Sequence, residues 1–322
     1  MTVGNETDGA GGRADVDRSP MVSAVVATRD RPEMLRRAVR AILGQEYAGA
    51  IECIVVFDQS EPSDIDVPVS PDRTVRLLHN DRTPGLAGAR NTGILAATGD
   101  LIAFCDDDDE WLPGKISRQV ELLERHPEAP LVGCSVVTHR PDADSDDKPK
   151  ISQPVVTRDD LLRSRVWELN PCTCLARLDL VRNEIGLVDE QLPGSYAEDY
   201  DWLLRAVNFG SVPMVREPLV RINWHQGSFF QRRWDTIIDA LTYLLGKHPE
   251  FERDPRGLAR ILGQIAFARA ASGQRRRARA DARKCLRSSW REPRGYLAIA
   301  VSYRLLSPQL VLRAAHARGK GI

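Results

Sequence analysis

A row of five acidic residues directly after an apolar run constrains this sequence more than any other feature. Residues 101–105 read as a buried strand, and Asp106 to Glu110 follow without a break. Carboxylates about 4 Å apart repel by roughly 4 kcal/mol per pair at an effective dielectric near 20, so the row must be solvated, partly protonated or bound to a cation. Acids at a strand's carboxyl end lie where open α/β sheets bind ligands, and hard oxygen ligands suit Mg²⁺ or Mn²⁺. A solvated acidic turn is the alternative.

Composition narrows the class of protein. The 322 residues are 42% hydrophobic and 28% charged, with zero formal net charge. Such a chain is globular and long enough for one large domain with an appendage, or for two domains. No apolar run approaches the ~20 residues that span a bilayer, and we expect the six scattered cysteines to be reduced and buried. These features predict a cytoplasmic protein.

Alternating strand and helix patterns predict parallel βαβ units in the first half. Apolar runs predict strands at 21–28, 52–57, 74–79, 101–105 and 131–138. Helices are expected between them, the first with Leu35, Ala38, Val39 and Ile42 on its buried face. Asp30 is predicted to cap that helix, with Glu33 as its third residue. Pro113 is predicted to lie in the first turn of a helix over 115–125.

The second half changes character. We expect a strand at 170–177, a short helix at 178–185, a helix opening near 194–202 and a strand at 212–220, after a surface excursion at 140–150. Everything beyond residue 229 reads as helical. Residues 251–322 carry 17 Lys/Arg against 4 Asp/Glu, which fits an acidic membrane surface, a partner or second subunit, or a solvated helical cap. Interleaved aromatics are absent, so no nucleic acid is expected.

Five motifs stand in the order found in family 2 glycosyltransferases. They are VVATRDRP at 25–32, DQS at 58–60, ARNTG at 89–93 after Gly85, FCDDDDEW at 104–111 and EDYDW at 198–202. Together they resemble an inverting GT-A enzyme over about residues 22–228. The resemblance implies an α/β fold with a Rossmann-like, mixed, mostly parallel sheet flanked by helices. An α-helical C-terminal extension follows that fold.

The resemblance also implies a division of the chain. Residues 1–20 are expected to be a disordered tail, and residues 21–228 the GT-A domain. Within that domain, 21–138 form the nucleotide-sugar half and 151–228 the acceptor half. Residues 229–322 form a basic helical C-terminal region.

The nucleotide side of the site is assigned from the same motifs. Thr28, Arg29 and Asp58 match positions near the nucleobase and ribose at the ends of the first two strands. Arg90 is expected either to meet the nucleotide or to form a salt bridge with a strand-end aspartate. Phe57 stands where many relatives carry another acid, which leaves the choice of nucleobase open.

Asp106 and Asp108 match the DxD positions that hold a divalent ion, Mn²⁺ or Mg²⁺, on the donor. Asp108 is the preferred direct ligand, and Asp106 is placed towards the ribose or the metal. Asp107 is expected on the nucleotide-sugar side and, like Asp109, in a supporting or helix-capping role. His225 matches a histidine that some relatives bring to the metal or the diphosphate, and a hydrogen-bonding loop residue is its other interpretation.

Glu198 and Asp199 match the family's catalytic base motif, with Asp199 the better candidate. Alternatively, both acids merely begin a helix in which Asp201 pairs with Arg205. Trp202 and Tyr196 are expected to line the acceptor cleft.

The resemblance therefore predicts metal-dependent, inverting transfer from a nucleoside-diphosphate sugar to a hydroxyl of a glycan, a lipid-linked acceptor or a small molecule. Such reactions build polysaccharides, glycolipids or glycosylated natural products. The basic C-terminal region would provide peripheral contact with the inner face of the membrane or form a homo-oligomer. A sugar nucleotidyltransferase is one alternative, but residues 28–32 lack the glycines its loop requires. A binding or scaffold module is the other, and it needs neither the acid row nor Glu198 and Asp199.

Overall fold

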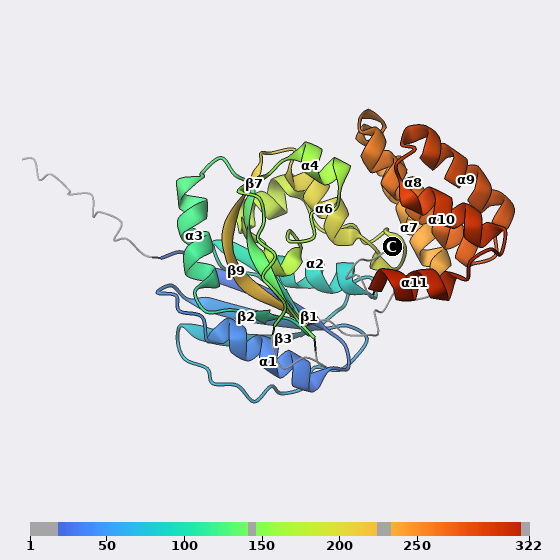
Figure 1. The fold of residues 1–322 in the computed structure, drawn as a ribbon. Coiled ribbons are helices and arrows are strands. Elements are labelled where there is room, and N and C mark those ends of the chain that lie inside the picture. Colours follow the sequence, from blue (N-terminus) through green and yellow to red (C-terminus); the bar gives the residue numbers. More distant parts are fainter. Residues whose placement is uncertain (1–18, 141–145, 224–232, 317–322) are drawn as a thin grey trace, which may run out of the picture.

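The fold is a mixed sheet between two layers of helices, followed by a helical region (Figure 1). The computed structural model describes residues 19–140, 146–223 and 233–316, so all but the last two residues of the predicted tail at 1–20 lie outside it. The strand order is β3-β2-β1-β4-β8-β6-β9-β5, with β7 paired to β9. The strands are β1 Val22–Thr28, β2 Ile51–Phe57, β3 Arg73–His79, β4 Leu101–Asp106, β5 Glu110–Trp111, β6 Leu131–His139, β7 Val155–Val156, β8 Leu175–Arg177 and β9 Val212–Asn223.

Parallel pairing dominates the first half, as the βαβ pattern predicts. β1 pairs in parallel with both β2 and β4, and β2 pairs in parallel with β3. β8 then runs antiparallel between β4 and β6. The predicted mixed, mostly parallel sheet is therefore confirmed.

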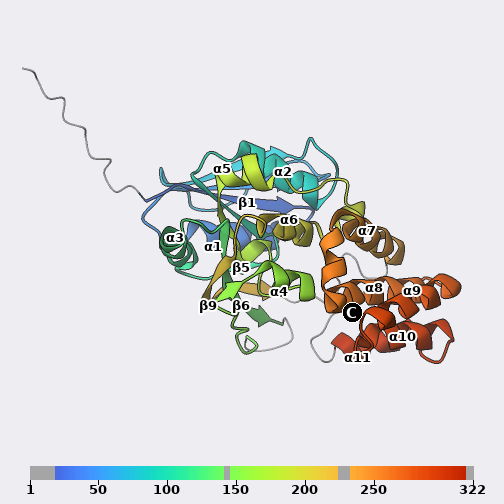
Figure 2. The same cartoon turned by 90° about the horizontal axis from the view of Figure 1, so that it is seen from above.

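Helices cover both faces of the sheet because each buries one apolar side (Figures 1 and 2). The apolar side chains of α1 Pro32–Leu43 and α3 Lys115–Arg125 share one core with one face. Those of α2 Leu86–Ala96 and α6 Glu198–Ala206 share a second core with the other face. The smaller helices are α4 Arg158–Arg163 and α5 Leu178–Leu180. The predicted face of α1 is confirmed, since Leu35, Ala38, Val39 and Ile42 are all buried.

Three local predictions are wrong. Asp30 does not cap α1: Arg31 holds the N-cap position, no side chain caps the helix, and Asp30 adopts a φ of 54°. Pro113 lies before the N-cap Gly114 of α3 and so outside its first turn. Residues 170–177 are not one strand, because Asn170 caps a 3₁₀ turn at 171–173 that precedes the short β8.

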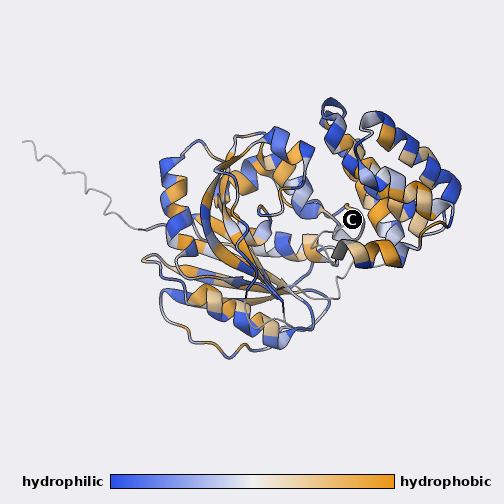
Figure 3. Ribbon diagram, viewed as in Figure 1, coloured by the Kyte–Doolittle hydropathy of each residue, from blue (hydrophilic) through white to orange (hydrophobic). Residues whose placement is uncertain are grey.

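The helical region follows the sheet domain and confirms the helical pattern beyond residue 233. It contains α7 Trp234–Lys247, α8 Pro255–Ala271, α9 Arg275–Ser288, α10 Pro293–Ser302 and α11 Pro308–His316. Small apolar side chains such as Ala266, Ala278 and Ala298 form a core of its own. Its outer helix α9 is predominantly hydrophilic (Figure 3). Among the described helices, none combines the length and apolar character that crossing a membrane requires.

A buried ionic network fastens α6 to the helical region. Asp201 on α6 is fully buried, and its carboxylate accepts a hydrogen bond from Arg205 at 3.1 Å. The end of α7 supplies the Lys247 ammonium at 3.0 Å and His248 Nε2 at 2.8 Å. Burial acts to raise the pKa of Asp201, but these partners outweigh it and hold the pKa at about 2. The Asp201–Arg205 pair expected in the alternative interpretation of α6 is thus present.

Candidate active site

The carboxyl ends of the parallel strands bring the predicted nucleotide side chains to one edge of the sheet. In the strand register, Thr28 lies opposite Phe57, and Ala27 lies opposite Asp106. Asp58 follows directly after Phe57. Because all these strands point the same way, the side chains meet where α/β sheets bind ligands.

Asp58 is held as an ionised carboxylate at this edge. One oxygen accepts hydrogen bonds from the Asn80 amide at 2.8 Å and from the Gly85 backbone N–H at 2.9 Å. Gly85 is the N-cap of α2 and has a φ of 123°, a conformation that favours glycine. Burial acts to raise the pKa of Asp58, but these hydrogen bonds keep it below its ordinary value. A fixed acceptor of this kind suits the polar groups of a nucleoside.

The acid row begins beside β1. The Thr28 hydroxyl donates a hydrogen bond to Asp107 at 2.8 Å. The Arg31 guanidinium lies 3.1 Å from an Asp107 oxygen and 2.8 Å from an Asp108 oxygen. Asp107 is thus held by one hydroxyl and one guanidinium. The Asp108 side chain next to Arg31 is 24% exposed.

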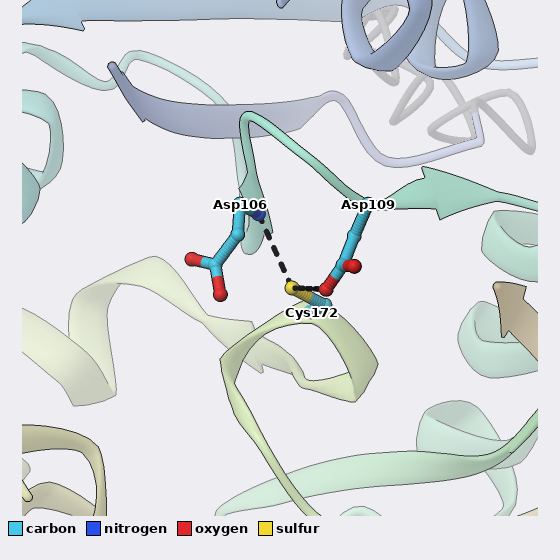
Figure 4. A group of neighbouring side chains, drawn as sticks. All are labelled: Asp106, Asp109 and Cys172. Carbon is cyan, nitrogen blue, oxygen red and sulfur yellow. Dashed lines mark hydrogen bonds between the residues drawn. The ribbon is translucent and has the colours of Figure 1, made fainter. Parts of the chain in front are cut away.

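Asp106 and Asp109 flank the thiol of Cys172, which comes from the turn before β8, and the Asp106 backbone N–H donates to the sulfur at 3.2 Å (Figure 4). One ligand atom from each of the three side chains lies within 4.8 Å of the others. The thiol donates to Asp109 at 3.3 Å, and the backbone N–H of Asn223 donates to the same carboxylate at 3.0 Å. Burial and repulsion by Asp106 and Asp108 raise the pKa of Asp109 well above its ordinary value.

This donor set fits a hard divalent cation through its carboxylates. Asp106, Asp108 and Asp109 crowd negative charge that a cation would relieve. Hydrogen bonding with Cys105, together with burial, raises the pKa of the Cys172 thiol. Mg²⁺ and Mn²⁺ prefer carboxylate oxygens to a soft sulfur ligand, so the aspartates are the donors that suit these ions.

Arg90 on α2 joins the acid row to the predicted base. Its side chain is 6% exposed and donates to Asp106 at 2.7 Å and to Glu198 on α6. The two carboxylates raise the pKa of Arg90 against the effect of burial. The salt bridge to a strand-end aspartate, one of the two expected roles of Arg90, is present. The same guanidinium therefore holds Glu198 close to Asp106.

Glu198 and Asp199 have opposite protonation tendencies although they are neighbours at the start of α6. Burial raises the pKa of Glu198 to about 7, although Arg90 acts in the opposite direction. Burial also acts to raise the pKa of Asp199, but Arg165 and Arg90 lower it below its ordinary value. Arg165 donates a hydrogen bond directly to Asp199, and the Tyr200 backbone N–H donates at 2.8 Å. Asp199 is therefore the ionised acid of the pair, which is the form a general base requires.

A small pocket opens beside this pair. Its lining includes Arg90, Phe104, Asp199 and Trp202. The Trp202 ring is buried, packs edge to face on Phe104 and donates its N–H to the Gly186 carbonyl at 3.2 Å. Tyr196 is in extended conformation two residues before α6 begins and is partly buried.

Two predicted residues remain. Arg29 is exposed and lies 3.8 Å from Asp30, although its charge contributes to the low pKa of Asp58. His225 lies outside the described residues.

Three residues of this constellation were not predicted. Arg31 lies within the first motif at 25–32, and this position could have identified it as a site residue. Arg165 and Cys172 belong to no motif, and only the folded chain brings them to Asp199 and Asp109.

Comparisons with known proteins agree with the motifs. Residues 23–178 match the model of glycosyl transferase family 2. The succinoglycan biosynthesis protein ExoO of Rhizobium meliloti is 39% identical over 110 residues, which are 34% of this chain and 31% of that protein. The UDP-Glc:alpha-D-GlcNAc-diphosphoundecaprenol beta-1,3-glucosyltransferase WfgD of Escherichia coli is 30% identical over 103 residues, 32% of this chain and 41% of that protein. The alignments thus span between 31% and 41% of the length of these two relatives.

The fold is also found in a solved structure. TarS of S. aureus, residues 1–349 in complex with UDP-GlcNAc, superposes with a TM-score of 0.56 at 14% identity, covering 88% of this chain and 91% of that one. At such identity the likeness shows the fold alone. The expected resemblance and the GT-A fold are both confirmed.

Proposed function

Residues 23–178 are a family 2 glycosyltransferase domain, and from this premise we propose that the chain is a metal-dependent inverting enzyme that moves a sugar from a nucleoside-diphosphate sugar to an acceptor hydroxyl. One observation carries the proposal. Arg90 bridges Asp106 of the acid row and Glu198 of the base pair. Donor-binding acids and a base candidate therefore belong to one site, as a single displacement requires.

On the donor side, we assign Thr28, Arg29 and Asp58 to the nucleoside, with Arg90, Asp106 and Asp107 beside the sugar diphosphate. Relatives support a UDP-sugar, because the TarS structures contain UDP-GlcNAc or UDP and WfgD is named for UDP-Glc. We therefore propose uracil as the nucleobase.

Asp106 and Asp108 would hold Mg²⁺ or Mn²⁺, with His225 as a further candidate ligand. When bound, the ion offsets the charge that develops on the departing diphosphate. Arg31, which pairs with Asp108, would have to share that carboxylate with the ion.

The transfer itself is an in-line displacement. The acceptor oxygen forms a bond with the anomeric carbon, the bond from that carbon to the diphosphate oxygen breaks, and the hydroxyl proton passes to Asp199. One displacement inverts the anomeric configuration. Arg90 holds Glu198 and so fixes the end of α6 that faces the donor. Trp202, which lines the pocket, and Tyr196 would border the acceptor.

We further propose that the acceptor is a sugar linked to a lipid diphosphate, as the name of WfgD describes for that enzyme. The division into a domain at 21–228 and a helical region at 229–322 is part of the same proposal. The helical region would bring the site to a membrane that carries the acceptor.

Asp108→Asn tests the donor site. We expect the variant to lose most metal-dependent affinity for UDP-sugars, because it removes a charged ligand of the ion while Arg31 remains. Isothermal titration calorimetry with UDP and Mn²⁺ measures this loss, and a titration without metal measures the remainder. Asp64→Asn, in an exposed position, is the matched control. Equal metal dependence in Asp108→Asn and native protein would remove Asp108 from the proposal.

An assay of product release separates the alternatives. A glycosyltransferase releases UDP slowly from a UDP-sugar even without its acceptor. A nucleotidyltransferase would instead consume a nucleoside triphosphate and release pyrophosphate. A scaffold module would bind or ignore the nucleotide without turnover.

The helical region carries a surface suited to an anionic membrane. Its basic aromatic surface consists of Arg275, Arg276, Arg277 and Arg279 on α9, with exposed Trp290, Tyr296 and Tyr303. The Arg279 guanidinium lies 4.9 Å from the Tyr303 ring centroid, which places both residue types together. Basic residues attract anionic headgroups, and aromatic rings prefer the membrane interface. We therefore propose peripheral contact with the cytoplasmic leaflet.

Replacing Arg275, Arg276 and Arg277 by glutamine should weaken binding to phosphatidylglycerol vesicles at least tenfold, since each basic residue contributes about 1 kcal/mol near such a surface. Cosedimentation measures the effect, with neutral phosphatidylcholine vesicles as reference. Glutamine at the exposed Arg118, Arg125 and Arg216 removes the same charge from the sheet domain and should have little effect. An unchanged partition together with a lower mass in sedimentation velocity would identify the surface as a subunit interface instead.

A further inference from the structure

Three arginines from separate elements surround the start of α6. Arg165 follows α4 and binds Asp199 directly. Arg260 on α8 donates to the Tyr200 hydroxyl at 2.7 Å and lies 5.4 Å from the Tyr200 ring centroid. Arg294 opens α10 next to α8, where a Cβ on Gly263, one turn beyond Arg260, would lie 2.9 Å from the Arg294 Cβ. We call these three residues the arginine cluster.

The arginine cluster holds more positive charge than its neighbours neutralise. Arg165 pairs with Asp199, and Arg294 pairs with Glu292 at 2.8 Å. For Arg260, no carboxylate lies within ion-pair distance among the described residues. The Nε atoms of Arg260 and Arg294 are buried and have no hydrogen-bond acceptor there. Burial and the charges of Arg294 and Arg165 lower the pKa of Arg260.

A partly buried cation without a counterion is costly to a fold, so such an arrangement indicates a bound anion. The donor diphosphate is not the expected occupant, because the donor-binding acids lie on the Arg90 side of Glu198. The acceptor must instead lie beside Asp199, whose carboxylate takes its proton. Guanidinium groups with free N–H donors match phosphate oxygens in geometry and charge.

We propose that the arginine cluster binds the phosphate or diphosphate group of the acceptor substrate. This inference rests on the proposed function, and it gives α8 and α10 a direct part in acceptor recognition. It also gives Arg165 two states. Without acceptor it is paired with Asp199, and an anionic acceptor competes for Arg165 and so releases the carboxylate for proton transfer.

Pyrophosphate is the probe for this site. The full chain is kept in EDTA with UDP at a concentration that saturates it in the absence of metal, and it is titrated with pyrophosphate by calorimetry at constant ionic strength. Native protein should bind it, and Arg260→Gln should weaken binding about tenfold, the usual loss for one charged hydrogen-bonding partner. Arg260→Lys, which retains the charge and checks folding, should keep part of the affinity. Arg313→Gln, at an exposed position on α11, should bind like native protein.

The proposal is overturned if native protein does not bind pyrophosphate, if UDP and pyrophosphate compete for one site, or if Arg313→Gln weakens binding as much as Arg260→Gln. A second arm uses turnover. Arg260→Gln should raise KM for a diphosphate-linked acceptor and leave acceptor-independent release of UDP unchanged. If native protein neither binds UDP nor releases it from a UDP-sugar, the proposed function fails. In that case a pyrophosphate titration without UDP still tests whether the arginine cluster binds an anion.

Discussion

Asp199→Asn is expected to lower kcat for sugar transfer by about 10² to 10⁴, the usual contribution of a general base. The amide keeps the size of the side chain but cannot accept the hydroxyl proton. Affinity for the UDP-sugar should stay native, since Asp199 lies on the acceptor side of Glu198. Single-turnover transfer measures kcat, and calorimetry measures donor affinity. Transfer at the native rate would show that Asp199 is not the base.

The matched control is Asp179→Asn, an exposed acid near the same half of the sheet. Its kcat should equal that of native protein. The pH dependence of activity is a second measurement, and misfolding would not shift it in the predicted direction. Because Arg165 lowers the pKa of Asp199, the base stays ionised until the pH falls below the ordinary carboxylate range. The acid limb that Asp199 sets in the pH profile of kcat/KM, which reports the free enzyme, should therefore lie at that low pH, and Arg165→Gln should move this limb upward.

Arg90→Gln is expected to cost about 3–5 kcal/mol in the free energy of unfolding, the typical effect of removing one partner from a buried ion pair. Arg90 is 6% exposed and compensates both Asp106 and Glu198. The amide retains hydrogen bonding but leaves two carboxylates without their cation. Urea unfolding monitored by circular dichroism measures the loss.

Two further variants make this prediction specific. Arg90→Lys keeps the charge, but a single ammonium cannot present the two-armed donor that spans both carboxylates, so an intermediate loss is expected. Arg118→Gln removes an arginine that is 56% exposed and should change stability by less than about 0.5 kcal/mol. If Arg90→Gln unfolds within about 1 kcal/mol of native protein, the bridge does not hold the two halves of the site together.

Local sequence patterns were sufficient to predict the parallel strands of the sheet and most of the side chains at their carboxyl ends. Continuous apolar runs identified β1, β2 and β4 because strands buried on both faces have no polar positions. The strand ends then placed Thr28, Asp58 and Asp106 at one edge. The same reasoning failed at 170–177, where alternating residues form a turn that positions Cys172.

Residues that act across long separations could not be found in this way. Arg165 meets Asp199 from 34 positions away, and nothing near it in sequence distinguishes it from other surface arginines. Asp30 satisfies the spacing of a capping box, but the chain turns at this residue and Arg31 begins the helix instead. Tertiary charge pairing outweighed the local capping preference at this point.

The network around Asp201 has a practical consequence for anyone mapping this protein by mutagenesis. Lys247 and His248 lie some fifty positions beyond Asp199, in a helix outside the family match. Substitutions there would disturb the Asp201 carboxylate, two residues after Asp199, and shift the start of α6. In an activity screen they would be mistaken for damage to the chemistry itself. A truncated chain ending before α7 would carry the same defect, and its inactivity would say nothing about the catalytic residues.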